Sequence, residues 1–305
     1  MSSAKNKTVI IIAGPTAVGK TSAAIELAKY FKTEIISADS RQCYKEMDIG
    51  VARPSPNNLQ EIKHHFIASH SIRDGVNAAS FEKFALEKVS ELFLQYDTVM
   101  MVGGSGLYIR AFCEGLDEIP SVKTEIRTDI CRQFEEKGLI WLQEEIKLKD
   151  PEFYRAGEIQ NPQRMMRALE VVESTGQSVL HFRKGKKAER DFNIIKIGLQ
   201  LSKEQLHQNI NKRVDKMIEM GLVGEVKNLQ PYYRLNALQT VGYSEIFDYL
   251  NAKMSLAEAI GNIKTNTRQY AKRQMTWFRK DAEIKWFEPA QVKEMIEFVK
   301  GSIPF

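Results

Sequence analysis

One glycine-rich stretch near the start of the chain restricts the possible folds more than any other feature. It reads Gly14-Pro15-Thr16-Ala17-Val18-Gly19-Lys20-Thr21. A G-x-x-x-x-G-K-T pattern between an apolar run and a helix-compatible segment is typical of a phosphate-binding loop, whose backbone N–H groups surround a di- or triphosphate. A turn that only links strand to helix is the alternative. We predict that residues 14–21 bind a polyphosphate, with Lys20 neutralising its oxygens and Thr21 holding Mg²⁺.

Two further buried strands are predicted, and each runs into a turn that carries polar residues or glycine. Residues 34–38 lead to Asp39-Ser40-Arg41-Gln42, and residues 98–102 lead to Gly103-Gly104-Ser105-Gly106. Doubly wound parallel sheets bind ligands at the carboxyl ends of their strands, so both turns should converge on the phosphate loop. Asp39 then lies beside the polyphosphate, where support of Mg²⁺ and general-base catalysis are both open roles.

The segments between these strands supply a covering loop and a helix. Residues 43–54 are rich in turn-forming residues, so we predict a loop over the site. Apolar residues recur at helical spacing over 80–95, where Ser80 is the expected N-cap.

Histidines and cysteines do not form a recognisable metal or disulfide pattern. Adjacent histidines point in different directions, and no carboxylate or cysteine completes a ligand set, so we interpret them as packing residues. The three cysteines are widely spaced without a C-x-x-C pair, which predicts buried, reduced thiols. These residues are His64, His65 and His70, and Cys43, Cys113 and Cys131.

Strand patterns stop after Pro120 and helical patterns replace them. Residues 122–148 predict two helices separated by Gly138, and Asn161-Pro162 begins another helix that runs toward Gly176. A strand pattern returns at residues 194–199. This block therefore interrupts the α/β pattern as an all-helical insertion.

The length of 305 residues exceeds one ordinary domain of about 100–200 residues, which also favours a core with an insertion. We predict an α/β fold in which residues 1–120 and 190–305 form a P-loop NTPase-like parallel-sheet core. Residues 121–189 form the helical insertion domain. No apolar run is long enough for a membrane span, so we expect a cytoplasmic protein without membrane association, and a monomer.

The last predicted long helix is unusually basic. A capping box at Ser255 begins a helix that should reach Phe278. Exposed helices normally mix both signs of charge, but residues 264–280 contain no acidic residue, which predicts a phosphate backbone as partner. The helical spacing of Trp277 and Phe278 favours core packing over stacking on bases. The basic residues are Lys264, Arg268, Lys272, Arg273, Arg279 and Lys280.

Seven blocks, taken together and in this order, resemble the tRNA dimethylallyltransferases. They are GPTAVGKT at 14–21, Asp39-Ser40 with Tyr44 and MDIG at 47–50, His64-His65, GGSGLY at 103–108, QRMMRALE at 163–170, TVGY at 240–243 and QYAKRQMTWFR at 269–279. The combination spans nearly the whole chain and is far more specific than the phosphate loop alone. The resemblance implies transfer of a dimethylallyl group from dimethylallyl diphosphate to N6 of adenosine 37, beside the anticodon, with Mg²⁺. The tRNAs would be those that read codons beginning with U.

The resemblance also implies roles for single residues. Residues 14–21 would hold the donor diphosphate, Asp39 would act as the base at the adenine amine, and Arg213 would grip the leaving diphosphate. Lys272 and Arg273 are also expected to contact tRNA, because they belong to the basic segment at residues 264–280. The full set expected to contact tRNA is Asp39, Ser40, Arg41, Gln42, Ser105, Arg127, Gln163, Arg164, Met165, Met166, Arg167, Lys272 and Arg273.

Some positions depart from the family pattern. Ser105 stands where the family usually has threonine, which keeps the hydroxyl. Arg41-Gln42-Cys43 is not the commonest sequence after Asp-Ser, and Ala68 replaces an aspartate often found after the paired histidines. Two other functions remain open: a P-loop nucleoside or small-metabolite kinase, and an RNA-binding module whose phosphate loop is not used.

Overall fold

The computed structural model describes residues 7–157 and 159–303. The chain divides into two compact units, one comprising Met1–Glu114 with Glu189–Phe305 and the other Gly115–Ala188. The helical unit thus begins earlier than the predicted boundary at residue 121. No described helix is both long enough and apolar enough to cross a lipid bilayer.

The larger unit is built on a six-stranded sheet, as the phosphate-loop pattern predicts. Every neighbouring pair of strands is parallel, in the order β3-β2-β4-β1-β5-β6. Ala13 pairs with Gly103 on one side and Gly198 on the other, and Ala38 also pairs with Gly103, so four strands end at one edge. The strands are β1 Thr8–Ala13, β2 Ile35–Ala38, β3 His64–His65, β4 Thr98–Gly103, β5 Asn193–Leu199 and β6 Lys285–Phe287.

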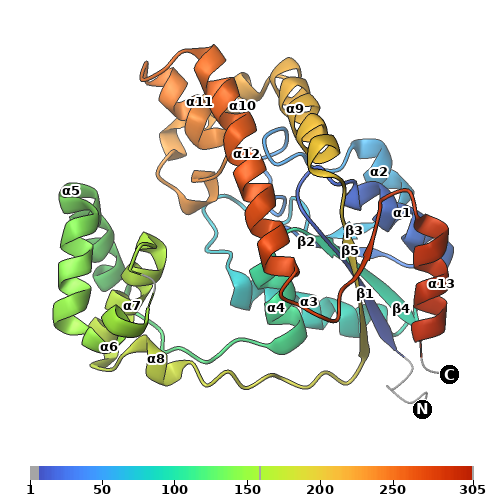
Figure 1. Cartoon of the computed structure of the whole chain (residues 1–305), viewed down its shortest axis with the longest axis horizontal. Helices are drawn as coiled ribbons and strands as arrows, with labels where there is room; N and C mark the ends of the chain where they lie inside the picture. Colours follow the sequence, from blue (N-terminus) through green and yellow to red (C-terminus); the bar gives the residue numbers. More distant parts are fainter. Residues whose placement is uncertain (1–6, 158, 304–305) are drawn as a thin grey trace. The chain divides into compact units, whose positions relative to one another are not determined.

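Side chains alternate between the two faces of this sheet, and helices cover both faces (Figure 1). Ile10 and Ile12 of β1 pack in the cluster that holds α1 and α13, whereas Val9 and Ile11 join the larger cluster on the opposite face. The first face carries α1 Lys20–Phe31 and α13 Val292–Ser302. The larger cluster includes α3 Ala78–Leu92, α4 Gly106–Glu114, α9 Lys203–Glu219, α10 Leu222–Asn228, α11 Tyr243–Leu250 and α12 Leu256–Phe278.

Helix caps explain where the helices begin. Ser255 accepts a hydrogen bond from the backbone N–H of Glu258, and α12 runs to Phe278 as predicted. The prediction for α3 is wrong at its start, because Asn77, and not Ser80, is the N-cap. Asn77 Oδ1 accepts from the N–H groups of Ala79 and Ser80 at 3.0 Å each, while Ser80 Oγ accepts from the Asn77 N–H at 2.9 Å. This reciprocal capping box places Ser80 inside the helix.

Short elements complete the larger unit. They are α2 Pro56–Glu61 and two 3₁₀ helices, η2 Gln230–Tyr232 and η3 Asn236–Leu238. The loop between β2 and α2 contains the predicted covering segment, whose Tyr44 and Met47 are buried.

All the regular secondary structure in the described part of the smaller unit is helical. Gly138 breaks helical geometry inside α5 with φ 77° and ψ −165°, which confirms the predicted division of this segment. Asn161 caps the start of α7, and Gly176, with φ 70°, is its C-cap, also as predicted. A separate core, including Leu142, Phe153 and Leu169, holds the unit together. Its helices are α5 Thr124–Lys149, α6 Pro151–Ala156, α7 Pro162–Thr175 and α8 Val179–Phe182.

Candidate functional site

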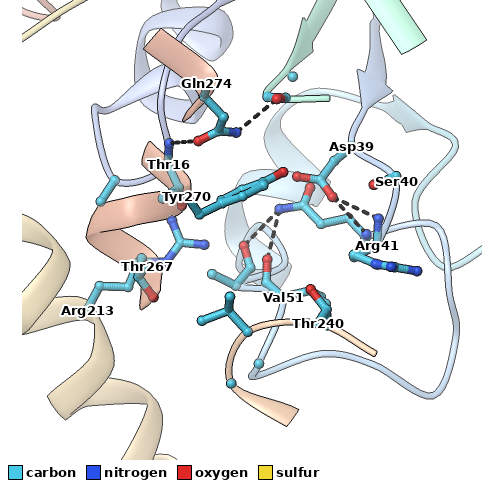
Figure 2. A pocket seen from close by; sticks show the side chains of 18 of the residues that line it. Thr16, Asp39, Ser40, Arg41, Val51, Arg213, Thr240, Thr267, Tyr270 and Gln274 are labelled. Atoms are coloured by element: carbon cyan, nitrogen blue, oxygen red, sulfur yellow. Dashed lines mark hydrogen bonds between the residues drawn. The ribbon is translucent and has the colours of Figure 1, made fainter. Parts of the chain in front are cut away.

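A pocket of about 920 Å³ opens at the carboxyl edge of the sheet, within the larger unit. The turns after β1 and β2, the loop at residues 50–52, helix α9 and helix α12 all contribute to its wall (Figure 2). The shared edge of parallel strands brings these distant segments together. Predicted site residues that line the pocket are Thr16, Ala17, Gly19, Lys20, Thr21, Asp39, Ser40, Arg41, Gln42, Arg213 and Arg273.

The phosphate loop has the backbone needed at the start of a helix that receives an anion. Gly19, the N-cap of α1, has φ 101°, a left-handed conformation that glycine adopts without strain. Ala17 is also left-handed, with φ 63°. Lys20 Nζ donates to the carbonyl oxygens of Gly14 at 3.0 Å and Pro15 at 2.8 Å. The lysine is therefore folded back over the loop that it would serve.

Burial changes the proton affinity of this lysine. It lowers the pKa of Lys20 from 10.5 to about 7, and the positive charge of Arg213 acts in the same direction. The negative charge of Asp39 partly opposes this shift. Lys20 is thus poised to lose its proton near neutral pH unless an anion binds beside it.

Binding of Mg²⁺–diphosphate at pH 8 should therefore take up close to one proton, because most Lys20 is neutral before binding and charged afterwards. Titration calorimetry in buffers of different ionisation enthalpy measures this uptake. The Lys20→Arg variant is the matched control, since its guanidinium stays charged. Equal proton uptake by both proteins would contradict the assignment of Lys20.

Asp39 lies at the end of β2 with one carboxylate oxygen held by the backbone. Its Oδ1 accepts hydrogen bonds from the N–H of Arg41 at 2.9 Å and of Gln42 at 3.2 Å. Figure 2 shows the phenol end of Tyr270 directed toward this carboxylate. Burial, with a contribution from the charge of Asp39, raises the pKa of Tyr270 to about 12, so the phenol keeps its proton at neutral pH. The backbone bonds fix the carboxylate in the pocket.

Arg213 projects from α9 into the same pocket. Burial lowers the pKa of its guanidinium, and the charge of Asp39 partly offsets that effect. The predicted meeting of phosphate loop, aspartate and arginine is thus seen in the geometry. Thr21 and Asp39 both line the pocket and offer the oxygen ligands that Mg²⁺ prefers.

Several predicted substrate contacts are occupied within the protein. Gln42 Nε2 donates to the carbonyls of Val51 at 3.2 Å and Ala52 at 3.0 Å, so its amide fixes the covering loop. Ser105 Oγ accepts from the Ser40 N–H at 2.9 Å and does not line the pocket. Gly14, Pro15 and Val18 are also outside the lining. Ser105 therefore joins the two turns rather than forming the pocket wall.

Sequence patterns missed a carboxylate that shapes the covering loop. Glu225 of α10 accepts from three successive backbone N–H groups, those of Asp48, Ile49 and Gly50, at 3.0, 2.7 and 3.0 Å. The Tyr243 hydroxyl donates to the same carboxylate at 2.5 Å. Glu225 thus holds the segment that brings Gly50 and its neighbours to the pocket. The turn-rich segment itself gave no signal for this partner.

The basic stretch of α12 is only partly available to a ligand. Lys264 pairs with Asp215 at 2.6 Å, and Arg268 donates to Asn211 at 2.7 Å. Lys272 and Arg273 are exposed beside Trp277 along a shallow groove. The interpretation of all six charges as one free surface is therefore wrong, because α9 neutralises or occupies two of them.

Trp277 corrects another prediction. Phe278 is 3% exposed and belongs to the core as expected, but Trp277 is 36% exposed and its ring lies against Gly106. Adjacent residues on a helix point about 100° apart, so both cannot face the same core. Trp277 adds an aromatic surface to the groove that Lys272 and Arg273 line.

In the helical unit, a buried carboxylate orders two predicted tRNA-contacting arginines. Glu170 lies 3.0 Å from Arg167 Nη1 and 3.8 Å from Arg127 Nε. Gln163 and Arg164 are exposed. Met165 and Met166 are 0% and 7% exposed, so side-chain contact of these two with tRNA is not supported. The helical period turns them into the core of the unit.

The histidines have partners that the sequence did not reveal. His65 Nε2 lies 2.5 Å from Glu34, and His64 Nδ1 lies 2.7 Å from the Ile62 carbonyl. Glu34 is a carboxylate partner that the sequence pattern did not indicate, and among the described residues no group of three or more potential metal ligands occurs. Cys43, Cys113 and Cys131 are free thiols, as predicted, but only Cys43 is buried; Cys113 and Cys131 are partly exposed.

Known proteins resemble this chain over nearly its whole length. The profile of a family described as IPP transferase matches residues 42–281. A tRNA dimethylallyltransferase of Christiangramia forsetii is 49% identical, covering 97% of this chain and 98% of the relative. The tRNA dimethylallyltransferase 1 of Bacteroides thetaiotaomicron is 44% identical over 96% and 95%.

Solved structures agree with these sequence relatives. The tRNA isopentenylpyrophosphate transferase of Bacillus halodurans superposes with a TM-score of 0.71 at 34% identity, covering 98% of this chain and 97% of that one. A eukaryotic dimethylallyltransferase acting on tRNA gives a TM-score of 0.76 at 26% identity, covering 94% of this chain and 75% of that one.

Proposed function

The chain belongs to the IPP transferase family, and from this premise we propose that it transfers a dimethylallyl group from dimethylallyl diphosphate to N6 of adenosine 37 in tRNA. The acceptors are tRNAs that read codons beginning with U. One observation carries the proposal: a single pocket joins a phosphate loop, the Asp39 carboxylate and the Arg213 guanidinium. Such a pocket offers a phosphate loop and a guanidinium to neutralise a diphosphate leaving group, and a carboxylate to accept the proton of an attacking amine.

Different groups of the pocket act on the leaving diphosphate and on the attacking amine. The N6–carbon bond forms while the bond from the allylic carbon to the diphosphate oxygen breaks, and the amine loses one proton. Lys20 and Arg213 neutralise the departing diphosphate, and Asp39 takes or orients the N6 proton. Thr21 would hold Mg²⁺, which would further neutralise the leaving group when bound. The adenine must leave its stack to reach this buried pocket.

Two surfaces are proposed for the tRNA. On the helical unit, Arg127, Gln163, Arg164 and Arg167 offer donors to phosphates. On α12, Lys272 and Arg273 flank the exposed Trp277, which provides a face for stacking. Ser40 and Arg41 follow Asp39 in the wall of the pocket and are proposed to contact the tRNA near the reacting base.

A single assay separates this activity from a kinase. Dimethylallyl diphosphate, ATP and unmodified tRNA are supplied singly and in pairs, and the tRNA nucleosides are then analysed by mass. We expect a five-carbon addition to adenosine only with tRNA and dimethylallyl diphosphate together. Phosphoryl transfer from ATP to a small acceptor without tRNA would overturn the proposal.

Salt dependence tests the α12 surface. Replacing both Lys272 and Arg273 by alanine should weaken tRNA binding severalfold and reduce the slope of log affinity against log salt by about 1–2, since each phosphate contact releases counterions. Affinity for dimethylallyl diphosphate should not change. The paired control is Lys293→Ala with Lys300→Ala, two exposed lysines of α13 on the opposite face of the sheet. An unchanged slope would remove α12 from the tRNA surface.

A further inference from the structure

Helix α12 carries a buried, uncharged polar residue that the reaction described above does not use. Gln274 is 7% exposed. Its Oε1 accepts a hydrogen bond from the backbone N–H of Thr16 at 2.8 Å, and its Nε2 donates to the carbonyl of Gly104 at 2.9 Å (Figure 2). Both ends of the amide are satisfied, so its orientation follows from its partners. Gln274 therefore links the phosphate loop to the turn after β4.

Close packing makes this link specific. A Cβ atom at Gly104 would lie 2.4 Å from Gln274 Nε2, well inside contact distance. Glycine at this position leaves room for the glutamine amide. Glutamate at position 274 could not donate to the Gly104 carbonyl, and its charge would lie beside a loop built for an anion. Only a neutral group with both a donor and an acceptor fits this place.

The hydrogen bond from Thr16 to Gln274 also changes which backbone N–H groups of the phosphate loop can bind the ligand. The Thr16 N–H donates to Gln274 and is therefore not directed at the ligand. At the next residue of the loop, Asn209 Nδ2 of α9 donates to the Ala17 carbonyl at 3.2 Å. Ala17 has a left-handed backbone, which a non-glycine residue keeps only where its surroundings hold it. Side chains from two helices, α9 and α12, thus hold two successive residues of the loop.

We propose that Gln274 is a positioning residue for the diphosphate: by holding Thr16, it keeps the remaining loop amides and Lys20 in the arrangement that receives the anion. The inference rests on the proposed function only for the identity of the donor. Preorganised donors cost no rearrangement when the ligand arrives, so loss of the link reduces affinity.

The test uses Gln274→Met, which keeps the length of the side chain and removes both hydrogen bonds. Titration calorimetry with inorganic diphosphate and Mg²⁺ should show about tenfold weaker binding. The KM for dimethylallyl diphosphate should rise by a similar factor, with kcat reduced less than threefold and tRNA affinity unchanged. Hydrogen exchange of the Thr16 amide should become faster. Gln95→Met, an exposed glutamine at the opposite edge of the sheet, should behave like the wild type.

A second variant keeps the test decisive if Gln274→Met does not fold. Gly104→Ala displaces the same amide from its other end and should produce the same rise in the dissociation constant for diphosphate. The double variant should bind diphosphate about as weakly as either single variant, because both changes break the same link. Diphosphate affinity within twofold of wild type in folded variants overturns the proposal, as does a loss confined to tRNA binding. Diphosphate titration needs no prenyl transfer, so failure of the proposed function would be seen separately.

Discussion

Replacing Asp39 by asparagine is expected to lower turnover by about 10²–10⁴-fold, the usual contribution of a positioned general base. The exocyclic amine of adenine is a weak nucleophile, because its lone pair is delocalised into the ring. A carboxylate that accepts its N–H helps most while the new bond forms. Asparagine keeps the shape and can still accept from the N–H groups of Arg41 and Gln42, so the turn should remain in place. Diphosphate and tRNA should therefore still bind.

The competing role for Asp39 is support of Mg²⁺, and it predicts a different result. Loss of a metal ligand weakens metal or donor binding and is partly rescued by more Mg²⁺. Single-turnover rates at saturating tRNA and donor, measured across a Mg²⁺ titration, distinguish the two roles. Asp97→Asn is a matched control, because Asp97 pairs with Lys7 at the opposite edge of the sheet. Rescue of Asp39→Asn by metal would remove Asp39 from the catalytic residues.

Arg213→Ala is expected to lower turnover by about 10–100-fold, at about 1.4 kcal/mol for each factor of ten. The guanidinium lies in the pocket with Lys20 and Asp39, where it can form charge-assisted hydrogen bonds to the leaving diphosphate. Charge builds on that group as the bond breaks, so the loss should appear mainly in kcat. Affinity for tRNA should stay nearly intact.

Two further variants sharpen the Arg213 experiment. Arg213→Lys keeps the charge but loses the planar pair of donors, so we expect partial recovery of the rate. Lys212→Ala removes the neighbouring exposed charge on α9 and should keep the wild-type rate. A variant Arg213→Ala that loses only tRNA affinity would show that this arginine belongs to the tRNA surface instead.

Local sequence patterns were sufficient for the elements and for the chemistry of the main site. The apolar run before Gly14 and the helix-compatible segment after Thr21 predict a strand, loop and helix, and the structure has them, although α1 already begins at Lys20. Strand ends in a parallel sheet share an edge, so Asp39 could be placed near the phosphate loop from order alone. Gly138 and Gly176 marked helix boundaries because their backbone conformations are local properties.

Tertiary structure decided which side chain each backbone group meets, and this depends on contacts between segments far apart in sequence. Gln274 meets Thr16 across 258 positions, and Glu225 meets Ile49 across 176. A periodic pattern gives the apolar face of a helix but not the identity of its neighbour, so it placed Trp277 in the core. The expected contact of Met165 with tRNA came from the family resemblance, and the burial of this side chain does not support it. The sequence by itself determined which chemical groups meet at the carboxyl edge of the sheet: a phosphate loop, a carboxylate and an arginine. Packing of α9, α10 and α12 decided how those groups are held, because hydrogen bonds between distant segments form only once the chain has folded.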